Sequence, residues 1–157
     1  MSEHDLSLLI DGLKGSANVL QICFSHSWGG LEQTAAEDAL EIARHQLPIR
    51  VACLQGSPLH EYLVHNEKDL DALKVVPVDF EPKDYLDFSM KRFLEQQLSD
   101  GVSVVHTQQV AQLWNLAPWL WSKPKVPLFA SRYLISENDQ RNFLQRAIYS
   151  RLDALIV

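Results

Sequence analysis

The residues best suited to chemistry follow two apolar segments that the sequence predicts to be buried strands. Gly29 and Gly30 come shortly after segment 19–24, and His106 ends segment 102–106. A glycine pair lets the backbone approach a ligand closely and permits positive φ angles. An imidazole titrates near neutral pH, so it can hydrogen-bond a ligand hydroxyl or phosphate. We therefore place a candidate binding site at a glycine turn and a histidine.

Each of these residues also has a purely structural interpretation. The glycine pair would serve equally as a tight turn before a helix, whose free N–H groups suit a phosphate. Glu32, in the first turn of that helix, either contacts substrate or only balances the helix dipole. His106 is either a ligand contact or a buried structural histidine, and His26 is a further candidate for substrate binding.

Motifs for other chemistries are missing from the sequence. The glycine turn lacks the G-x-G-x-x-G spacing of dinucleotide sites, and no G-x-x-x-x-G-K-[ST] phosphate loop occurs. No serine lies in a G-x-S-x-G elbow. Histidine and cysteine do not recur at metal-ligand spacings, so the sequence predicts neither a metal site nor a cofactor.

Apolar runs typical of buried strands alternate with segments of helical periodicity along almost the whole chain. Such alternation predicts a parallel sheet with helices on both faces, which is a Rossmann-like doubly wound α/β fold in three α/β/α layers. The predicted strands, about six, cover 19–24, 49–54, 73–78, 102–106, 126–130 and 154–157. The predicted helices cover 31–46, a segment that starts at 58, and 82–98, 110–121 and 138–152.

The order of the strands decides whether the candidate residues meet. Ligands of open α/β sheets bind at the carboxyl ends of the strands, where the strand order reverses. In the common order 3-2-1-4-5-6, the first and fourth predicted strands are neighbours at that point. Because neighbouring strands lie about 4.8 Å apart, the glycine turn and His106 should face one pocket.

Composition limits the class of protein. The 157 residues and the 46% hydrophobic, 22% charged composition suit one soluble domain, and the net charge of −6 argues against a general nucleic-acid binder. We expect an arm or short helix at 1–17 and the domain at 18–157. No apolar run is long enough to span a membrane, and no signal peptide is evident. Two cysteines in apolar runs indicate buried free thiols, hence the cytoplasm.

Charge is uneven along the chain. Residues 1–119 hold 8 basic and 17 acidic side chains (net −9), whereas residues 120–157 hold 6 basic and 3 acidic ones (net +3). This asymmetry indicates either an ordinary solvated helix face or contact with an anionic partner. We assign Arg132, from the basic group, to substrate binding.

Several motifs, in this order and spacing, resemble the N-terminal half of family 4 (group 1) retaining glycosyltransferases of the GT-B fold. The resemblance covers residues 19–157. The segments that carry it are Leu20-Gln21-Ile22, Gly29-Gly30-Leu31-Glu32, Arg50-Val51-Ala52, Ser57-Pro58-Leu59, Val104-Val105-His106-Thr107-Gln108 and the run from Arg146 to Val157.

The resemblance implies roles for the candidate residues. Gly29 and Gly30 would lie by the donor diphosphate or the transferred sugar, and His106 would hold the reacting sugar or the acceptor as a catalytic residue. In this fold the N-terminal domain chiefly binds the acceptor. The C-terminal domain binds the nucleotide-sugar through two glutamates seven residues apart and basic residues, and we expect that domain to be missing here. Gln108 stands where the family often has a second histidine.

The leading hypothesis is therefore the acceptor-binding half of a glycosyltransferase in cell-envelope polysaccharide synthesis. Its partners would be a glycan or lipid-linked acceptor and, only with the missing domain, a nucleotide-sugar. One wall of a cleft cannot enclose the departing diphosphate, so we expect no sugar transfer by this chain alone. Peripheral contact with the inner face of the membrane, through Trp114, Trp119 and Trp121, and self-association are further expectations.

Two other hypotheses stay open. The same sheet could belong to a non-enzymatic ligand-binding or interaction domain of Rossmann-like fold. It could also belong to an enzyme that acts on another nucleotide-linked substrate.

Overall fold

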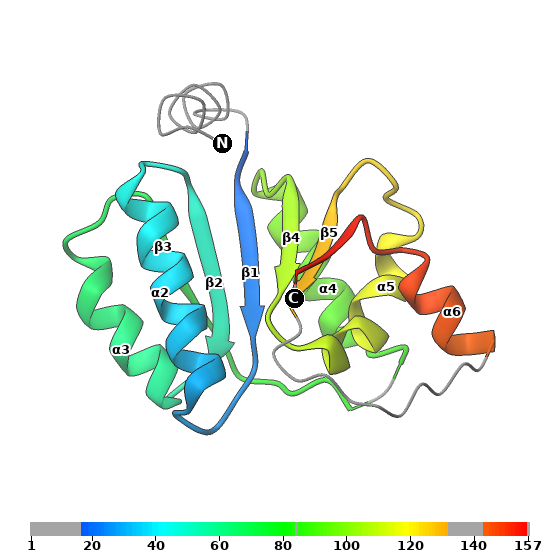
Figure 1. Cartoon of the computed structure of the whole chain (residues 1–157), viewed down its shortest axis with the longest axis horizontal. Coiled ribbons are helices and arrows are strands. Elements are labelled where there is room, and N and C mark those ends of the chain that lie inside the picture. The colour runs from blue at the N-terminus through cyan, green and yellow to red at the C-terminus, as the bar shows by residue number, and fades with distance from the viewer. Residues whose placement is uncertain (1–16, 84, 132–142, 157) are drawn as a thin grey trace.

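The computed structural model describes residues 17–83, 85–131 and 143–156. Its centre is a six-stranded sheet in the order β3-β2-β1-β4-β5-β6, with every neighbouring pair parallel. Figure 1 shows β1 and β4 side by side in the middle of this sheet. The predicted Rossmann-like parallel sheet and its strand order are confirmed.

The strands form where short apolar runs are buried on both faces of the sheet. In β1, Leu20, Ile22 and Cys23 are completely buried, as parallel strands covered on both sides require. The strands are β1 Val19–Cys23, β2 Ile49–Leu54, β3 Leu73–Val78, β4 Val104–Thr107, β5 Leu128–Ser131 and β6 Ala154–Ile156. The predicted strands therefore lie in the right places, with ends shifted by up to two residues.

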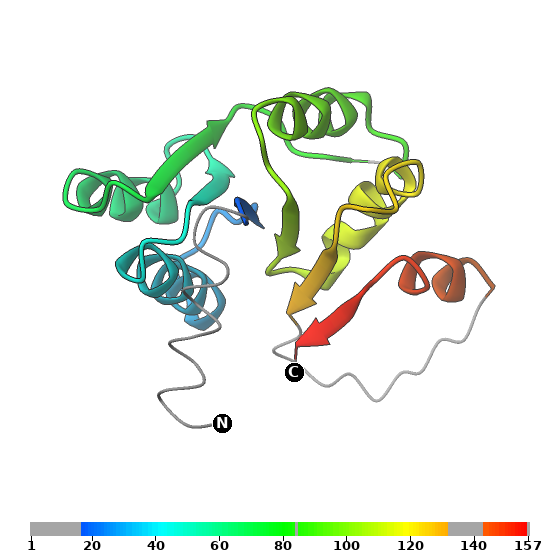
Figure 2. The same cartoon turned by 90° about the horizontal axis from the view of Figure 1, so that it is seen from above.

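The helices lie in two layers, one on each face of the sheet. Buried residues of α2 and α3 pack with β1–β3 on one face, and those of α4, α5 and α6 pack with the central strands on the other. Figure 2 shows these two groups on opposite sides of the sheet. The helices are α2 Gly30–Arg44, α3 Pro58–Glu67, α4 Phe88–Ser99, η1 Val110–Gln112, α5 Leu113–Leu120 and α6 Phe143–Tyr149.

Local sequence sets where these helices begin and end. Ser57 caps α3 by accepting a hydrogen bond from the His60 N–H, and Pro58 begins the helix, as predicted. Gly101 follows α4 with a φ of 96°, the left-handed conformation expected of it. The predicted start of α4 at Pro82 is wrong: Asp87 caps the helix by accepting hydrogen bonds from the N–H groups of Ser89 and Met90.

The segment 79–87, before α4, is consequently a connection that passes from one layer of helices to the other. Its Pro82, Lys83 and Tyr85 lie beside residues that follow β1 and β4. It therefore adds side chains to the edge of the sheet where the candidate site was expected. Residues 1–16 of the predicted arm, and 138–142 of the predicted last helix, lie outside the described residues.

Candidate functional site

The candidate site lies where β1 and β4 end next to each other. Gln21 is level with His106 and Ile22 with Thr107. After β1 the chain enters α2 on one face, whereas after β4 it enters η1 and α5 on the other. This reversal is the point at which open α/β sheets bind ligands. The prediction that these two strands are neighbours in the sheet is confirmed.

The Gly29–Gly30 turn forms the start of α2, with Gly29 as its N-cap residue. Neither glycine has a positive φ: among the described residues, positive-φ glycines occur only at Gly56 and Gly101. A Cβ on Gly30 would meet nothing within 4 Å, whereas one on Gly29 would lie 3.3 Å from Glu32 Oε2. The pair therefore provides an open approach to the end of the helix rather than an unusual backbone conformation.

Glu32 folds back over this turn and is only 5% exposed. Its Oε2 accepts a hydrogen bond from the Gly29 N–H at 2.7 Å, and its Oε1 accepts from the hydroxyls of Ser25 and Ser27. Burial acts to raise the pKa of Glu32, but the hydrogen bonds from Ser25, the backbone and Ser27 outweigh it and lower the pKa below its usual 4.5. A charged carboxylate thus already lies at the N-terminus of α2, where a phosphate was expected to bind.

His106 lies on the face of the sheet that α2 covers. Its Nε2 is 2.8 Å from the hydroxyl oxygen of Ser131, the last residue of β5. Burial lowers the pKa of His106 below its usual 6.5, although the carboxylate of Asp38 acts in the opposite direction. The imidazole is therefore neutral at pH 7, with one nitrogen able to donate a hydrogen bond and the other able to accept one.

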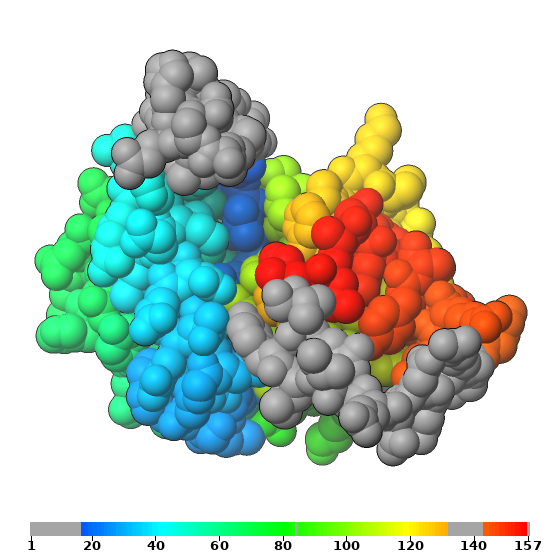
Figure 3. Space-filling model, in the orientation of Figure 1, coloured from blue at the N-terminus to red at the C-terminus, as the bar shows by residue number. Residues whose placement is uncertain are grey.

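Polar side chains from three elements surround His106. In β1, Gln21 donates a hydrogen bond from Nε2 to the Ala35 carbonyl oxygen, and its Oε1 is buried without a partner among the described residues. Gln108 donates from Nε2 to Asp38 Oδ2 at 3.2 Å. Figure 3 shows the surface hollowed between α2 and β6, with β1 and β4 in the floor. A half-buried histidine among amide and hydroxyl groups suits a polar, hydroxyl-bearing ligand.

The predicted site residue His26 contacts other groups than His106. His26 forms an ion pair with Glu81 and has a 76% exposed side chain. It lines a separate cavity of about 480 Å³ near the ends of β2 and β3. Arg132 lies outside the described residues.

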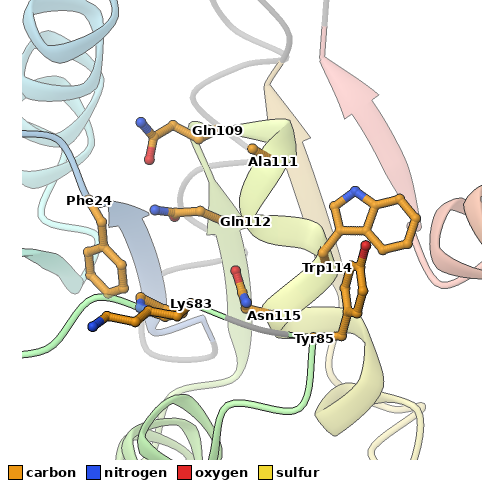
Figure 4. Close-up of a pocket in the computed structure, with 9 residues that line it drawn as sticks. Phe24, Lys83, Tyr85, Gln109, Ala111, Gln112, Trp114 and Asn115 are labelled. Atoms are coloured by element: carbon orange, nitrogen blue, oxygen red, sulfur yellow. The ribbon is translucent and has the colours of Figure 1, made fainter.

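A larger cavity, of about 550 Å³, lies on the opposite side of the same strand ends, and no sequence pattern predicted it. Figure 4 shows the amide groups of Gln109 and Gln112 extending toward the side of the cavity where Phe24 lies. The cavity is lined by Phe24, Pro82, Lys83, Tyr85, Gln109, Ala111, Gln112, Trp114 and Asn115. The strand-end rule could have found Gln109, which follows β4 closely, and Ser131, which directly follows the predicted fifth strand. The contribution of Lys83 and Tyr85 could not be found, because their segment was predicted to be helix.

The described residues hold no group of three or more histidine, cysteine, aspartate or glutamate side chains placed to bind a metal. Cys23 and Cys53, level with each other on β1 and β2, are free and buried. Burial, with a smaller effect of Glu32 on Cys23 and of Glu67 on Cys53, raises the pKa of both thiols to about 12. These thiols are therefore protonated at neutral pH and serve as small core residues.

The three tryptophans expected at a membrane differ in their surroundings. Trp114 and Trp119 pack against the core, and only Trp121 among them is largely exposed, at 46%. Within the described residues, no helix combines the length and the apolar character needed to cross a membrane.

Comparisons with known proteins bear on the fold. No protein-family model and no curated protein matches the sequence. Among solved structures, the crystal structure of Acinetobacter baumannii MurG is similar, with a TM-score of 0.54 over 88% of this chain at 10% sequence identity. The matched part is 40% of the MurG chain, so this chain spans less than half the length of that protein. At this identity the likeness shows a shared α/β fold.

Proposed function

We propose that the chain is the acceptor-binding half of a glycosyltransferase. In the complete enzyme, a sugar would pass from a nucleotide-sugar to a glycan or lipid-linked acceptor, in cell-envelope polysaccharide synthesis. The observation that carries the proposal is the position of His106. It lies one residue before the end of β4, next to β1, and the turn that follows β1 holds Gly29 and Gly30, in the order of motifs that resembles the family.

The fold supports this proposal. MurG is a GT-B glycosyltransferase, and this chain resembles a part of it that corresponds to 40% of its length. The open end of the sheet, with its polar side chains, faces outward and could form one wall of a cleft between two domains. The second wall, which would hold the nucleotide-sugar, would come from the other half of the enzyme.

The geometry also supports a chemical role for His106. Its Nε2 shares a hydrogen bond with Ser131, and its neutral imidazole lies on the polar face beside Gln21. We assign it to hold an acceptor hydroxyl, directly or after displacing Ser131, so that this oxygen is positioned for transfer. Gly29 and Gly30 would leave space for the sugar at the start of α2.

The test is a calorimetric titration of neutral oligosaccharides into the chain and two variants. His106→Ala should weaken the affinity about tenfold, or about 1.4 kcal/mol, as expected for one lost hydrogen bond. His65→Ala, on the exposed surface of α3, serves as the matched control and should leave the affinity unchanged. Equal affinities of His106→Ala and the unchanged chain would exclude this role.

One observation favours a second candidate, a non-enzymatic ligand-binding domain. The Glu32 carboxylate accepts a hydrogen bond from the Gly29 N–H at the start of α2. A diphosphate that approached this helix end would therefore meet a negative charge. A domain that binds an uncharged ligand and transfers nothing would show the same arrangement. This candidate predicts that sugar binding persists with no transfer in any combination with a donor-binding domain.

The two free thiols, level on neighbouring strands yet unbonded, support a reducing compartment. We therefore place the protein in the cytoplasm, at the inner face of the membrane if the acceptor is lipid-linked. Cell fractionation tests this location.

A further inference from the structure

The cavity between β1 and α5 has a chemistry that the site around His106 does not share. Three of its lining residues, Gln109, Gln112 and Asn115, are carboxamides, and Lys83 is the single cation. None of the described lining residues carries a carboxylate. A carboxamide both donates and accepts hydrogen bonds, as a hydroxyl does. The lining is therefore suited to a ligand with several hydroxyl groups.

One of these amides has an unmet hydrogen-bonding group. Gln109 Oε1 is buried and has no partner among the described residues. The amide oxygen of Gln112 differs in having a partner, since the Thr107 hydroxyl lies 3.4 Å away as a donor. A buried acceptor without a partner is destabilising, so a hydroxyl that donates to Gln109 Oε1 would bind favourably.

Aromatic rings form the apolar part of the cavity. Phe24 lies opposite the amides, and Tyr85 packs against Trp114 with ring centroids 4.9 Å apart (Figure 4). The faces of such rings carry partial negative charge and attract C–H groups. A saccharide ring offers C–H groups on its faces and hydroxyls around its rim, which matches aromatic walls with amides beside them.

Other ligand classes fit less well. A phosphate would find only one lysine in the described lining. The helix α5, which contributes Trp114 and Asn115, continues directly from η1 and so offers no free N-terminus to an anion. A purely apolar ligand would leave the buried Gln109 Oε1 without a hydrogen bond. The volume of about 550 Å³ falls within the roughly 300–1,000 Å³ of small-molecule sites.

We propose that this cavity binds a neutral saccharide unit of the acceptor. The inference rests on the proposed function and names the substrate class of its acceptor side. Thr107 and His106 are consecutive in β4 and point to opposite faces of the sheet, so this unit would lie apart from the hydroxyl that His106 holds. The acceptor would then extend across the end of β4.

The test follows side-chain NH₂ signals and the Trp114 indole N–H signal by ¹H–¹⁵N NMR. The probes are methyl glycosides of glucose, galactose, mannose and N-acetylglucosamine, with inorganic phosphate as the anionic comparison. At least one glycoside should shift the signals of Gln109, Gln112 and Asn115, and phosphate should not. Gln109→Leu should weaken the binding of that glycoside about fivefold, as expected for one lost hydrogen bond. The matched control is Gln33→Leu, at an exposed position on α2, which should leave the binding unchanged.

A second variant fills the cavity without touching the core. Ala111 is exposed in η1, so Ala111→Phe should abolish the shifts while signals elsewhere keep their positions. Glycoside shifts confined to His106 and Ser131 would overturn the cavity assignment and leave the proposed function standing. Shifts by phosphate but by no glycoside, or no glycoside shift at all, would also overturn it; the proposed function is then decided separately by the His106 titration.

Discussion

At the scale of single residues, the turn at the start of α2 combines two roles that the sequence could not separate. Glycine at 29 and 30 predicted a turn with room for a ligand, and the turn is there. Glu32 was expected either to contact substrate or to balance the helix dipole, and its hydrogen bonds to Gly29, Ser25 and Ser27 support the second role. These hydrogen bonds depend on the backbone conformation of residues 25–29, which no local sequence pattern predicts.

Glu32→Gln should lower the free energy of unfolding by about 1–2 kcal/mol at neutral pH, because the charged acceptor of three hydrogen bonds is lost. A carboxylate with a lowered pKa stabilises the fold above its unfolded pKa, and that contribution disappears as the pH falls through the folded value. The difference between the variant and the unchanged chain should therefore shrink in acid. Urea unfolding at neutral and acidic pH measures it.

The matched control is Glu37→Gln, an exposed position on the same helix, which should change the stability little at either pH. A difference that stays constant from neutral to acidic pH would contradict the role assigned to the Glu32 charge.

At the scale of elements, periodicity and strand-end rules predicted most of the arrangement. The strands β1 and β2 are mostly apolar and buried, and Gly101, Ser57 and Pro58 mark helix ends by simple backbone chemistry. The prediction that the helix starts at Pro82 was wrong because the apolar Leu86 fits the helical stripe of α4, whereas the helix in fact begins after its cap, Asp87. The cavity beside it was missed for the same reason.

Arg151 shows a related limit of sequence patterns. It was counted in the basic group that could face an anion, but it is only 8% exposed. Its guanidinium donates to the carbonyl oxygens of Leu120, Lys123 and Val126 and pairs with Asp153. Arg151 therefore links the turn after α5 to the residues just before β6 by hydrogen bonds, and its guanidinium is not available to a ligand.

Arg151→Leu should destabilise the protein by about 2–4 kcal/mol, because buried carbonyl groups lose their donors. Arg146→Leu, exposed on the neighbouring helix α6, should cost far less. Thermal unfolding of the two variants, followed by circular dichroism, compares them. Equal melting temperatures would show that the contacts of Arg151 contribute nothing.

At the scale of the whole molecule, the sheet presents a polar edge with two different surfaces. One surface holds His106, Ser131 and Gln21 beneath α2, and the other is the amide-lined cavity beside α5. Both suit hydroxyl-bearing ligands, and Glu32 places negative charge where a diphosphate would approach. This distribution agrees with the proposal that the chain forms the acceptor side of a sugar-transfer cleft, and the Glu32 charge by itself agrees equally with the non-enzymatic candidate.

The most direct test of that division compares neutral oligosaccharides with UDP-, GDP- and ADP-sugars on the same purified chain, by calorimetry and by a radiolabel transfer assay. We expect saccharide binding without measurable nucleotide-sugar binding, and no transfer by the chain alone. Tighter binding of a nucleotide-sugar than of any saccharide, or robust turnover of a nucleotide-sugar, would contradict the assignment of this chain to the acceptor side.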